Sequence, residues 1–203
     1  LGEQLSAQFL SDPGAREALR EALAEREMTV ACLHSGLTPE QFATADRLSE
    51  RIELAAELAV DLRAPLLKLP SPPPGTEATA RLRAACLAAR PSEVTLVFEN
   101  VPGSCWDSGA ACDAPLLELA QEHRVGFAFN PAHFAHVGEH PFLGTWRATK
   151  LKRFTRIIYA CDGCFPGRPK YTPLLNGNGE VKEVISIFRA RSFDGFVTLK
   201  MGD

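Results

Sequence analysis

Polar side chains stand at the ends of four apolar segments in the second half of the chain. Glu99 follows VTLVF, Asn130 follows VGFAF with His133 three residues later, Asp162 follows TRIIYAC, and Lys200 follows GFVTL. Short apolar runs bounded by turn residues are typical of buried strands, and ligand sites of parallel sheets gather at the carboxyl ends of the strands. A carboxylate, a carboxamide, an imidazole and an ammonium group in one place could transfer protons, hold a cation or bind a polar ligand.

The elements that would position these residues alternate between strand and helix. The apolar runs predict strands over 28–36, 64–70, 93–100, 125–131, 155–163 and 195–203, and helical spacing predicts helices over 15–27, 38–62, 76–91, 114–124 and 180–191. Strands that are apolar throughout indicate a parallel sheet covered on both faces, which is either an open doubly wound sheet or a closed barrel. The turn LHSGLTPEQ is a poor phosphate-binding fingerprint. The polar ends of several strands therefore favour the barrel.

Composition narrows the class of protein. The 203 residues are 45% hydrophobic and 23% charged, which is typical of one globular domain. A net charge of −3, with 22 basic residues scattered among 25 acidic ones, argues against a nucleic-acid partner. No apolar run approaches the roughly 18 residues needed to cross a membrane, and the start of the chain has no signal-peptide pattern. We expect a cytoplasmic protein without a membrane partner, and mostly reduced thiols among its six cysteines.

The ordered strand ends resemble those of the xylose isomerase-like TIM barrels, the superfamily of sugar isomerases, sugar-phosphate epimerases, inosose dehydratases and endonuclease IV. The resemblance is carried by VTLVFEN, VGFAFNPAHFAHVG, TRIIYACD, LLNGNGEVKEVI and SFDGFVTLK. It implies a (β/α)8 barrel in which these strands are the third to the eighth, with the first two absent from this chain and one partial barrel domain over residues 1–203. Because open sheet edges leave backbone groups unpaired, we expect residues before Leu1 or a partner to cover the edge.

The resemblance also implies a divalent cation, such as manganese, magnesium, cobalt or zinc, held by Glu, Asp, His and Glu from four successive strands. Glu99 matches the first ligand, but Asn130, Tyr159 and Lys200 stand at the other three positions. His133 matches a histidine that touches substrate or metal in the family, so Glu99 and His133 are the two remaining metal-ligand candidates. A hard divalent ion needs anionic oxygen ligands to offset its dehydration, and tight binding is therefore not expected.

Three of the four expected metal ligands are replaced, and one of the replacements is Lys200. We hypothesise that its ammonium group takes the place of the cation beside Glu99. Two interpretations stay open. In the first, Glu99 and Lys200 are a retained ion pair in a barrel that has lost catalysis. In the second, the protein is a metal-free isomerase or lyase in which Glu99 is the base and Lys200 is the electrophile or a Schiff-base amine. That role requires burial to lower the pKa of Lys200.

Other polar residues are predicted to contact the substrate around the same opening. They are Asn130, His133, Tyr159, Asp162, Lys68, Arg168 and His34. Lys68 and Arg168 would bind a phosphate or carboxylate of a sugar-like ligand. Cysteines and histidines in the surrounding loops allow a second interpretation, a zinc site at a new position. The simpler interpretation is that these residues are scattered thiols and imidazoles. That second set comprises Cys105, Cys112, His133, His136, His140, Cys161 and Cys164.

The sequence therefore predicts an isomerase- or epimerase-like protein that acts on or binds a small sugar or sugar phosphate at the barrel opening, with a degenerate metal site. The alternative is a non-catalytic ligand-binding or scaffold protein that keeps the barrel. The expected partners are a small carbohydrate-like molecule and, in a homodimer, a second copy of the chain. Endonuclease activity is disfavoured because the chain lacks both a multi-zinc ligand set and a basic face for DNA.

Overall fold

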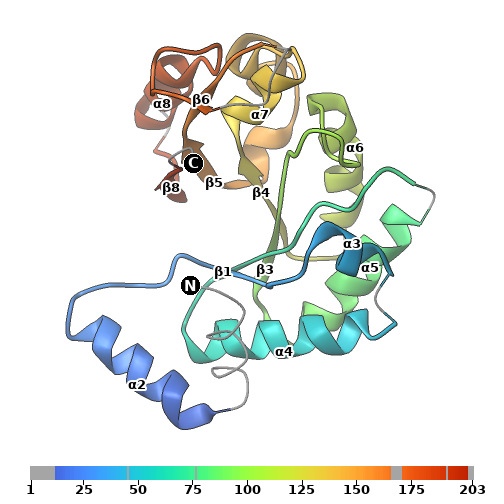
Figure 1. Cartoon of the computed structure of the whole chain (residues 1–203), viewed down its shortest axis with the longest axis vertical. Helices are drawn as coiled ribbons and strands as arrows, with labels where there is room; N and C mark the ends of the chain where they lie inside the picture. Colours follow the sequence, from blue (N-terminus) through green and yellow to red (C-terminus); the bar gives the residue numbers. More distant parts are fainter. Residues whose placement is uncertain (1–11, 45, 76, 166–170, 191, 201–203) are drawn as a thin grey trace.

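Six parallel strands form the central sheet in a computed structural model, which describes residues 12–44, 46–75, 77–165, 171–190 and 192–200. The strand order is β1-β2-β3-β4-β5-β8, and each neighbouring pair is parallel (Figure 1). The strands are β1 (Cys32–His34), β2 (Leu66–Lys68), β3 (Thr95–Glu99), β4 (Val125–Phe129), β5 (Thr155–Ala160) and β8 (Phe196–Leu199). This confirms the predicted parallel sheet and the order of its strands.

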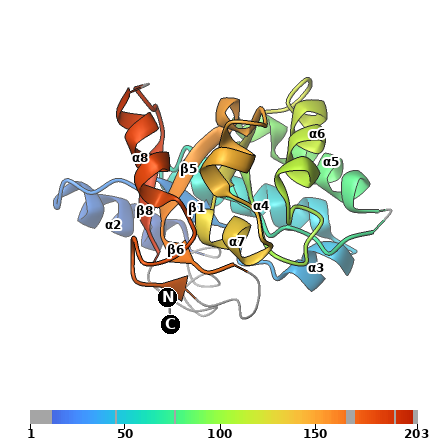
Figure 2. The same ribbon diagram turned by 90° about the horizontal axis from the view of Figure 1, so that it is seen from above.

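Helix α2 (Pro13–Ala24) precedes the first strand, has no buried residue and lies beside α4. The helices that follow the strands are α3 (Pro39–Thr44), α4 (Leu48–Asp61), α5 (Ala78–Ala89), α6 (Gly109–Leu119), α7 (Pro131–His136) and α8 (Val181–Ala190). Short helical segments follow some of them: η1 (Arg90–Ser92), η2 (Pro141–Trp146) and η3 (Leu151–Arg153). Figures 1 and 2 place α4, α5 and α6 along one side of the sheet.

Two helices differ from their predicted bounds by more than three residues. The single helix predicted over 38–62 is two helices, α3 and α4. Phe42 in α3 and Leu48 in α4 are both buried, and residues at this spacing would point to different sides of one helix with about 3.6 residues per turn. The helix predicted over 114–124 begins earlier, at Gly109, because Ser108 accepts a hydrogen bond from the amide of Ala111 at 3.2 Å and caps it.

The sheet is curled, with its concave face toward the interior of a barrel. Lys68 on β2 and Tyr159 on β5 are hydrogen-bonded at 2.9 Å although two strands separate them. In a flat sheet with the usual strand spacing of roughly 4.8 Å, β2 and β5 would lie about 14 Å apart. Within the described residues β1 and β8 form the sheet edges, so the curled sheet is a TIM barrel that lacks part of its wall.

Each face of the curled sheet has its own apolar core. The outer face packs against the helices through an aromatic group of Phe98, Trp106, Phe127, Phe129 and Phe134. The concave face carries a smaller cluster that includes Leu66, Val97, Ala128, Ile157 and Tyr159. Strands buried on both faces explain why their sequences are apolar throughout.

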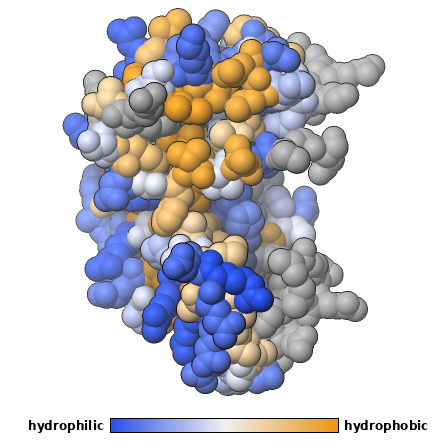
Figure 3. All heavy atoms as spheres, turned by 90° about the vertical axis from the view of Figure 1, so that its left-hand side faces the viewer, coloured by the Kyte–Doolittle hydropathy of each residue, from blue (hydrophilic) through white to orange (hydrophobic). Residues whose placement is uncertain are grey.

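Figure 3 shows the side of the molecule that carries α2 in its lower half and α8 and β8 in its upper half. Polar side chains dominate the lower half, and apolar ones gather above. Val197 and Leu199 of β8 are 56% and 75% exposed. None of the helices within the described ranges is long and apolar enough to cross a membrane.

Candidate functional site

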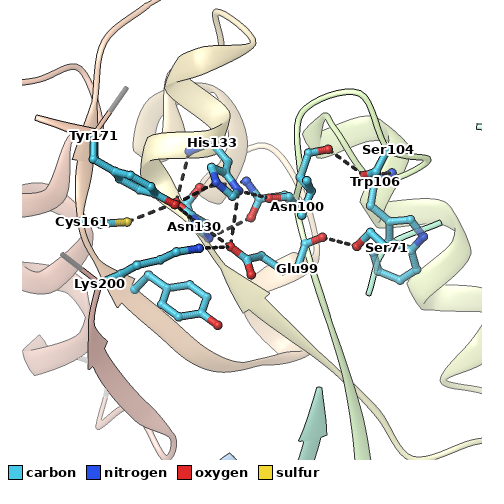
Figure 4. Close-up of polar contacts among 12 residues, drawn as sticks. Ser71, Glu99, Asn100, Ser104, Trp106, Asn130, His133, Cys161, Tyr171 and Lys200 are labelled. Atoms are coloured by element: carbon cyan, nitrogen blue, oxygen red, sulfur yellow. Dashed lines mark hydrogen bonds and ion pairs between the residues drawn. The ribbon is translucent and has the colours of Figure 1, made fainter. Parts of the chain in front are cut away.

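Glu99 lies at the carboxyl end of β3, buried on the concave side of the sheet (Figure 4). Its carboxylate forms an ion pair with Lys68 and another with Lys200, whose Nζ is 3.2 Å from Oε1. The amide Nδ2 of Asn130 donates to Oε1 at 2.6 Å, and His133 Nδ1 is 3.4 Å from the same oxygen. The strand ends therefore bring together Glu99, Asn130, His133 and Lys200, as the curled sheet predicted from the sequence requires.

We call this group the mouth cluster. It comprises Lys68, Glu99, Asn130, His133, Tyr159, Tyr171 and Lys200. His133 belongs to α7 and Tyr171 lies in the segment before α8, and the others lie at or next to the carboxyl ends of β2, β3, β4, β5 and β8. Burial alone would raise the pKa of Glu99, but the ammonium groups of Lys68 and Lys200 outweigh it and hold this pKa at about 2. The carboxylate is therefore ionised over the whole physiological range.

Both lysines contact Tyr159. Their Nζ atoms are 5.1 and 5.0 Å from the ring centroid, and Lys68 also donates to the hydroxyl. Burial lowers the pKa of Lys200, but Glu99 and Tyr171 more than offset this and leave it raised. The Schiff-base role predicted for Lys200 needs a lowered pKa, so the structure argues against that role.

Asn130 is oriented by the chain around it. Its Oδ1 accepts from the amide of His133 at 3.2 Å, which caps α7, and from the thiol of Cys161 at 3.2 Å. The side chain of Asn100 donates to the carbonyl of Asn130 and accepts from its amide, both at 2.8 Å. These contacts direct the Nδ2 donor of Asn130 at Glu99, where an aspartate would place a second carboxylate.

His133 is neutral and carries its proton on Nδ1. Nδ1 lies 2.6 Å from the carbonyl oxygen of Asn100, which can only accept, and Nε2 lies 2.9 Å from the hydroxyl of Tyr171. Burial lowers the pKa of His133 to about 4, although Glu99 and the Asn100 carbonyl act in the opposite direction. The imidazole is thus an oriented hydrogen-bonding group at neutral pH.

Tyr171 was missed by the sequence reasoning. It belongs to a small antiparallel pair, β6 (Asp162–Gly163) and β7 (Tyr171–Thr172), which was not predicted either. Two-residue strands carry no alternation of polar and apolar residues, so no periodic signal marks them. The available signal was an aromatic residue in the loop that follows a predicted strand end.

The other predicted contact residues are placed differently. The carboxylate of Asp162 accepts from the backbone amides of Gly163, Gly177 and Gly179 at 2.8 to 2.9 Å, so it organises its own loop. His34 is exposed at the end of β1. Arg168 lies outside the described residues.

A hollow of about 340 Å³ opens beside the mouth cluster, between the ends of β1, β2 and β3. Its wall includes His34, Ser35, Lys68, Ser71 and Glu99. A larger hollow of about 750 Å³ lies at the opposite ends of the strands, near Thr95 and Thr155, away from the polar cluster. The smaller hollow is the candidate ligand site, because its wall includes Lys68 and Glu99 of the mouth cluster, whereas no residue of that cluster lines the larger one.

The donor set does not fit the divalent cation that the resemblance implies. Both oxygens of Glu99 face ammonium or amide donors, and Asn130 presents an N–H to it. Among the residues that the structure describes, no three His, Cys, Asp or Glu side chains form a group that could hold a metal. The six cysteines are unpaired, with Cys112 buried and bonded to the carbonyl of Trp106 and Cys164 exposed.

Comparison with known proteins defines the family. The family model described as xylose isomerase-like TIM barrel matches residues 3–203. The chain belongs to this family. No curated protein matches the chain.

Solved structures of xylose isomerase-like barrels share the fold of this protein. The probable 3-DHS dehydratase AsbF from Bacillus anthracis has a TM-score of 0.75 at 15% identity, over 93% of this chain and 76% of that chain. A xylose isomerase domain protein from Planctomyces limnophilus has a TM-score of 0.72 at 17% identity, over 94% and 77%. Endonuclease IV from Thermus thermophilus has a TM-score of 0.65 at 16% identity, over 93% and 74%.

Proposed function

We propose that this xylose isomerase-like barrel binds a small sugar or sugar phosphate at the mouth cluster without a divalent cation at Glu99. The observation that carries the proposal is the pair of ammonium groups, from Lys68 and Lys200, on the carboxylate that would otherwise be the first metal ligand. The side-chain amide of Asn130 supports the proposal as well. It donates a hydrogen bond directly to Glu99, so no cation is needed between these two side chains.

The hollow next to Glu99 supplies the groups that polyhydroxylated ligands need. An ammonium group has three N–H donors, and the described contacts of Lys68, to Glu99 and Tyr159, use two of them. The third donor, the hydroxyl of Ser35 and the imidazole of His34 can bind ligand oxygens in the hollow. Its volume of about 340 Å³ suits one small molecule.

Binding is better supported than turnover. A general base works best when its pKa lies near the operating pH, and the pKa of Glu99 is held at about 2. The second candidate is metal-free isomerisation, which the two ammonium groups favour because they could stabilise a developing oxyanion. Proton exchange between substrate and solvent separates the two candidates.

The test is calorimetric binding of aldose and ketose phosphates in the presence of EDTA. We expect binding that Lys68→Met and Lys200→Met each weaken at least tenfold, whereas Lys182→Met, on the exposed surface of α8, leaves it unchanged. Absence of binding, or binding that appears only after manganese is added, would overturn the proposal. Deuterium uptake at the carbon next to the carbonyl in D2O, followed by NMR, would favour isomerisation instead.

A further inference from the structure

We infer that, among sugar-like ligands, the mouth cluster binds a polyhydroxylated acid with a single carboxylate, such as a sugar acid, more tightly than a neutral sugar or a dianionic sugar phosphate. This inference rests on the proposed function and names the charge that its ligand site prefers. It is drawn from the charges that the structure brings together and from the donors that they leave uncommitted.

The described part of the mouth cluster holds one more positive charge than negative. Lys68 and Lys200 each carry an ammonium group, and Glu99 is the carboxylate that both of them contact. His133 adds no charge, since one of its ring nitrogens faces a carbonyl oxygen and the other the hydroxyl of Tyr171. Asp162 keeps its charge but is not part of this cluster, because the described ion pairs of both lysines are with Glu99 and the Asp162 carboxylate contacts three backbone amides of residues 163, 177 and 179.

The excess positive charge is partly buried, so water solvates it poorly. The side chain of Glu99 is 4% exposed, that of Lys68 is 14% exposed and that of Lys200 is 32% exposed. A partly buried charge without a counterion is destabilising, and a ligand anion that supplies the counterion binds favourably for the same reason. One carboxylate restores neutrality, whereas a phosphate dianion would place an excess negative charge beside Glu99.

The donors that line the hollow suggest where the carboxylate would bind. The backbones of Ser35 and Lys68 are adjacent, because the amide of Ser35 donates to the carbonyl of Lys68 at 3.0 Å. Both residues line the hollow, and the Ser35 hydroxyl, which accepts from the amide of Leu37, keeps its own hydrogen to donate, so we assign one carboxylate oxygen to it and the other to the third Lys68 donor. His34, at the rim of the same hollow, would then bind a hydroxyl of the ligand body.

The experiment compares ligands that share a six-carbon chain and differ in charge: glucitol, gluconate, glucarate and glucose 6-phosphate. Calorimetric titrations in EDTA should give gluconate an affinity at least tenfold above that of glucitol, with glucarate and the phosphate no tighter than gluconate. Raising the salt concentration should weaken gluconate binding and leave glucitol binding unchanged. This salt comparison uses the unmodified protein and so does not depend on the folding of a variant.

Variants locate the charge preference. Lys68→Met should remove the difference between gluconate and glucitol, Lys68→Arg should retain part of it, and Lys182→Met should retain all of it. Equal binding of gluconate and glucitol would overturn the inference while the proposed function stands, and tighter binding of the phosphate would overturn the single-charge requirement. Absence of binding of the aldose and ketose phosphates would overturn the proposed function itself.

Discussion

Glu99 links strands that are distant in the sequence through one buried carboxylate. Lys68 reaches it from the end of β2, Asn130 from the end of β4, and Lys200 from the residue after β8. Each contact is an ammonium or amide donor, so the carboxylate is a structural centre as well as a candidate binding group. Its removal should therefore be costly even without a ligand.

Glu99→Gln should lower the free energy of unfolding by about 3 kcal/mol, because removal of one member of a buried ion pair leaves the other charge uncompensated. Urea denaturation measures the change. The matched control is Glu118→Gln, which breaks an ion pair to Arg83 in which both side chains are about half exposed. Such surface pairs contribute roughly 0 to 1 kcal/mol, so equal effects of the two substitutions would contradict the importance of burial.

Stability should depend on pH through His133 and Glu99. The pKa of His133 is lowered from 6.5 to about 4, so the unfolded chain takes up its proton first and stability falls as the pH drops from about 6.5 to about 4. The pKa of Glu99 is lowered from 4.5 to about 2, so its contribution is complete above pH 4.5 and is lost as the pH falls toward 2. Urea midpoints between pH 7.5 and 3 measure both effects. His133→Asn should flatten the upper part of the profile, and an unchanged slope would contradict the assignment.

Metal binding should be recoverable by reversing two of the departures from the family pattern. Asn130→Asp combined with Lys200→Glu replaces a neutral donor and an ammonium group by two carboxylates near Glu99 and His133. We expect this double variant to bind manganese in calorimetry and the unmodified protein to bind it at least tenfold more weakly. Equal affinity of the two proteins would show that Lys200 does not exclude the cation. Asn130→Asp alone should destabilise the fold, because it sets two carboxylates against each other.

At the scale of elements, the turn at residues 177–179 before α8 is built around the carboxylate of Asp162. A Cβ on Gly177 would overlap both Oδ1 of Asp162 and the carbonyl of Gly163. Gly177→Ala should therefore lower the free energy of unfolding by about 2 kcal/mol, as overpacking does in a closed site. Gly75→Ala is the control, because nothing lies within 4 Å of its Cβ position. Thermal denaturation of both variants tests this, and similar shifts would count against a tightly packed loop.

The sequence was sufficient for the strands and for the contact between Glu99 and Lys200, but not for the roles of Asp162 and Lys68. The run TRIIYAC predicts β5 because its apolar residues are buried on both faces. The contact between Glu99 and Lys200 follows from the rule that parallel strands end at one edge of the sheet. The role of Asp162 depends on amides that come 15 and 17 residues later, which no local pattern reveals. Lys68 was assigned to the ligand alone, since its contact with Tyr159 exists only after the sheet has curled.

At the scale of the molecule, the sheet edges differ from its centre. Within the described residues β4 has a hydrogen-bonded strand on both sides, whereas β8 has one on a single side and exposes Val197 and Leu199. Hydrogen exchange followed by mass spectrometry should show β8 amides exchanging on the order of a hundredfold faster than those of β4. Protection of β8 equal to that of β4, together with a dimer in sedimentation, would instead support the expected homodimer and a covered edge.

The reciprocal bonds between Asn100 and Asn130 have a practical consequence for changing what the protein recognises. The side chain of Asn100 bonds the backbone of Asn130, and the side chain of Asn130 bonds Glu99, the amide of His133 and the thiol of Cys161. The rim between β3 and β4 is therefore held by a continuous set of hydrogen bonds. Libraries that seek new ligands should therefore keep both asparagines and diversify residues 34 and 35. Gly36 should be kept as well, because its φ of 72° is in the left-handed region that side chains with a Cβ rarely adopt.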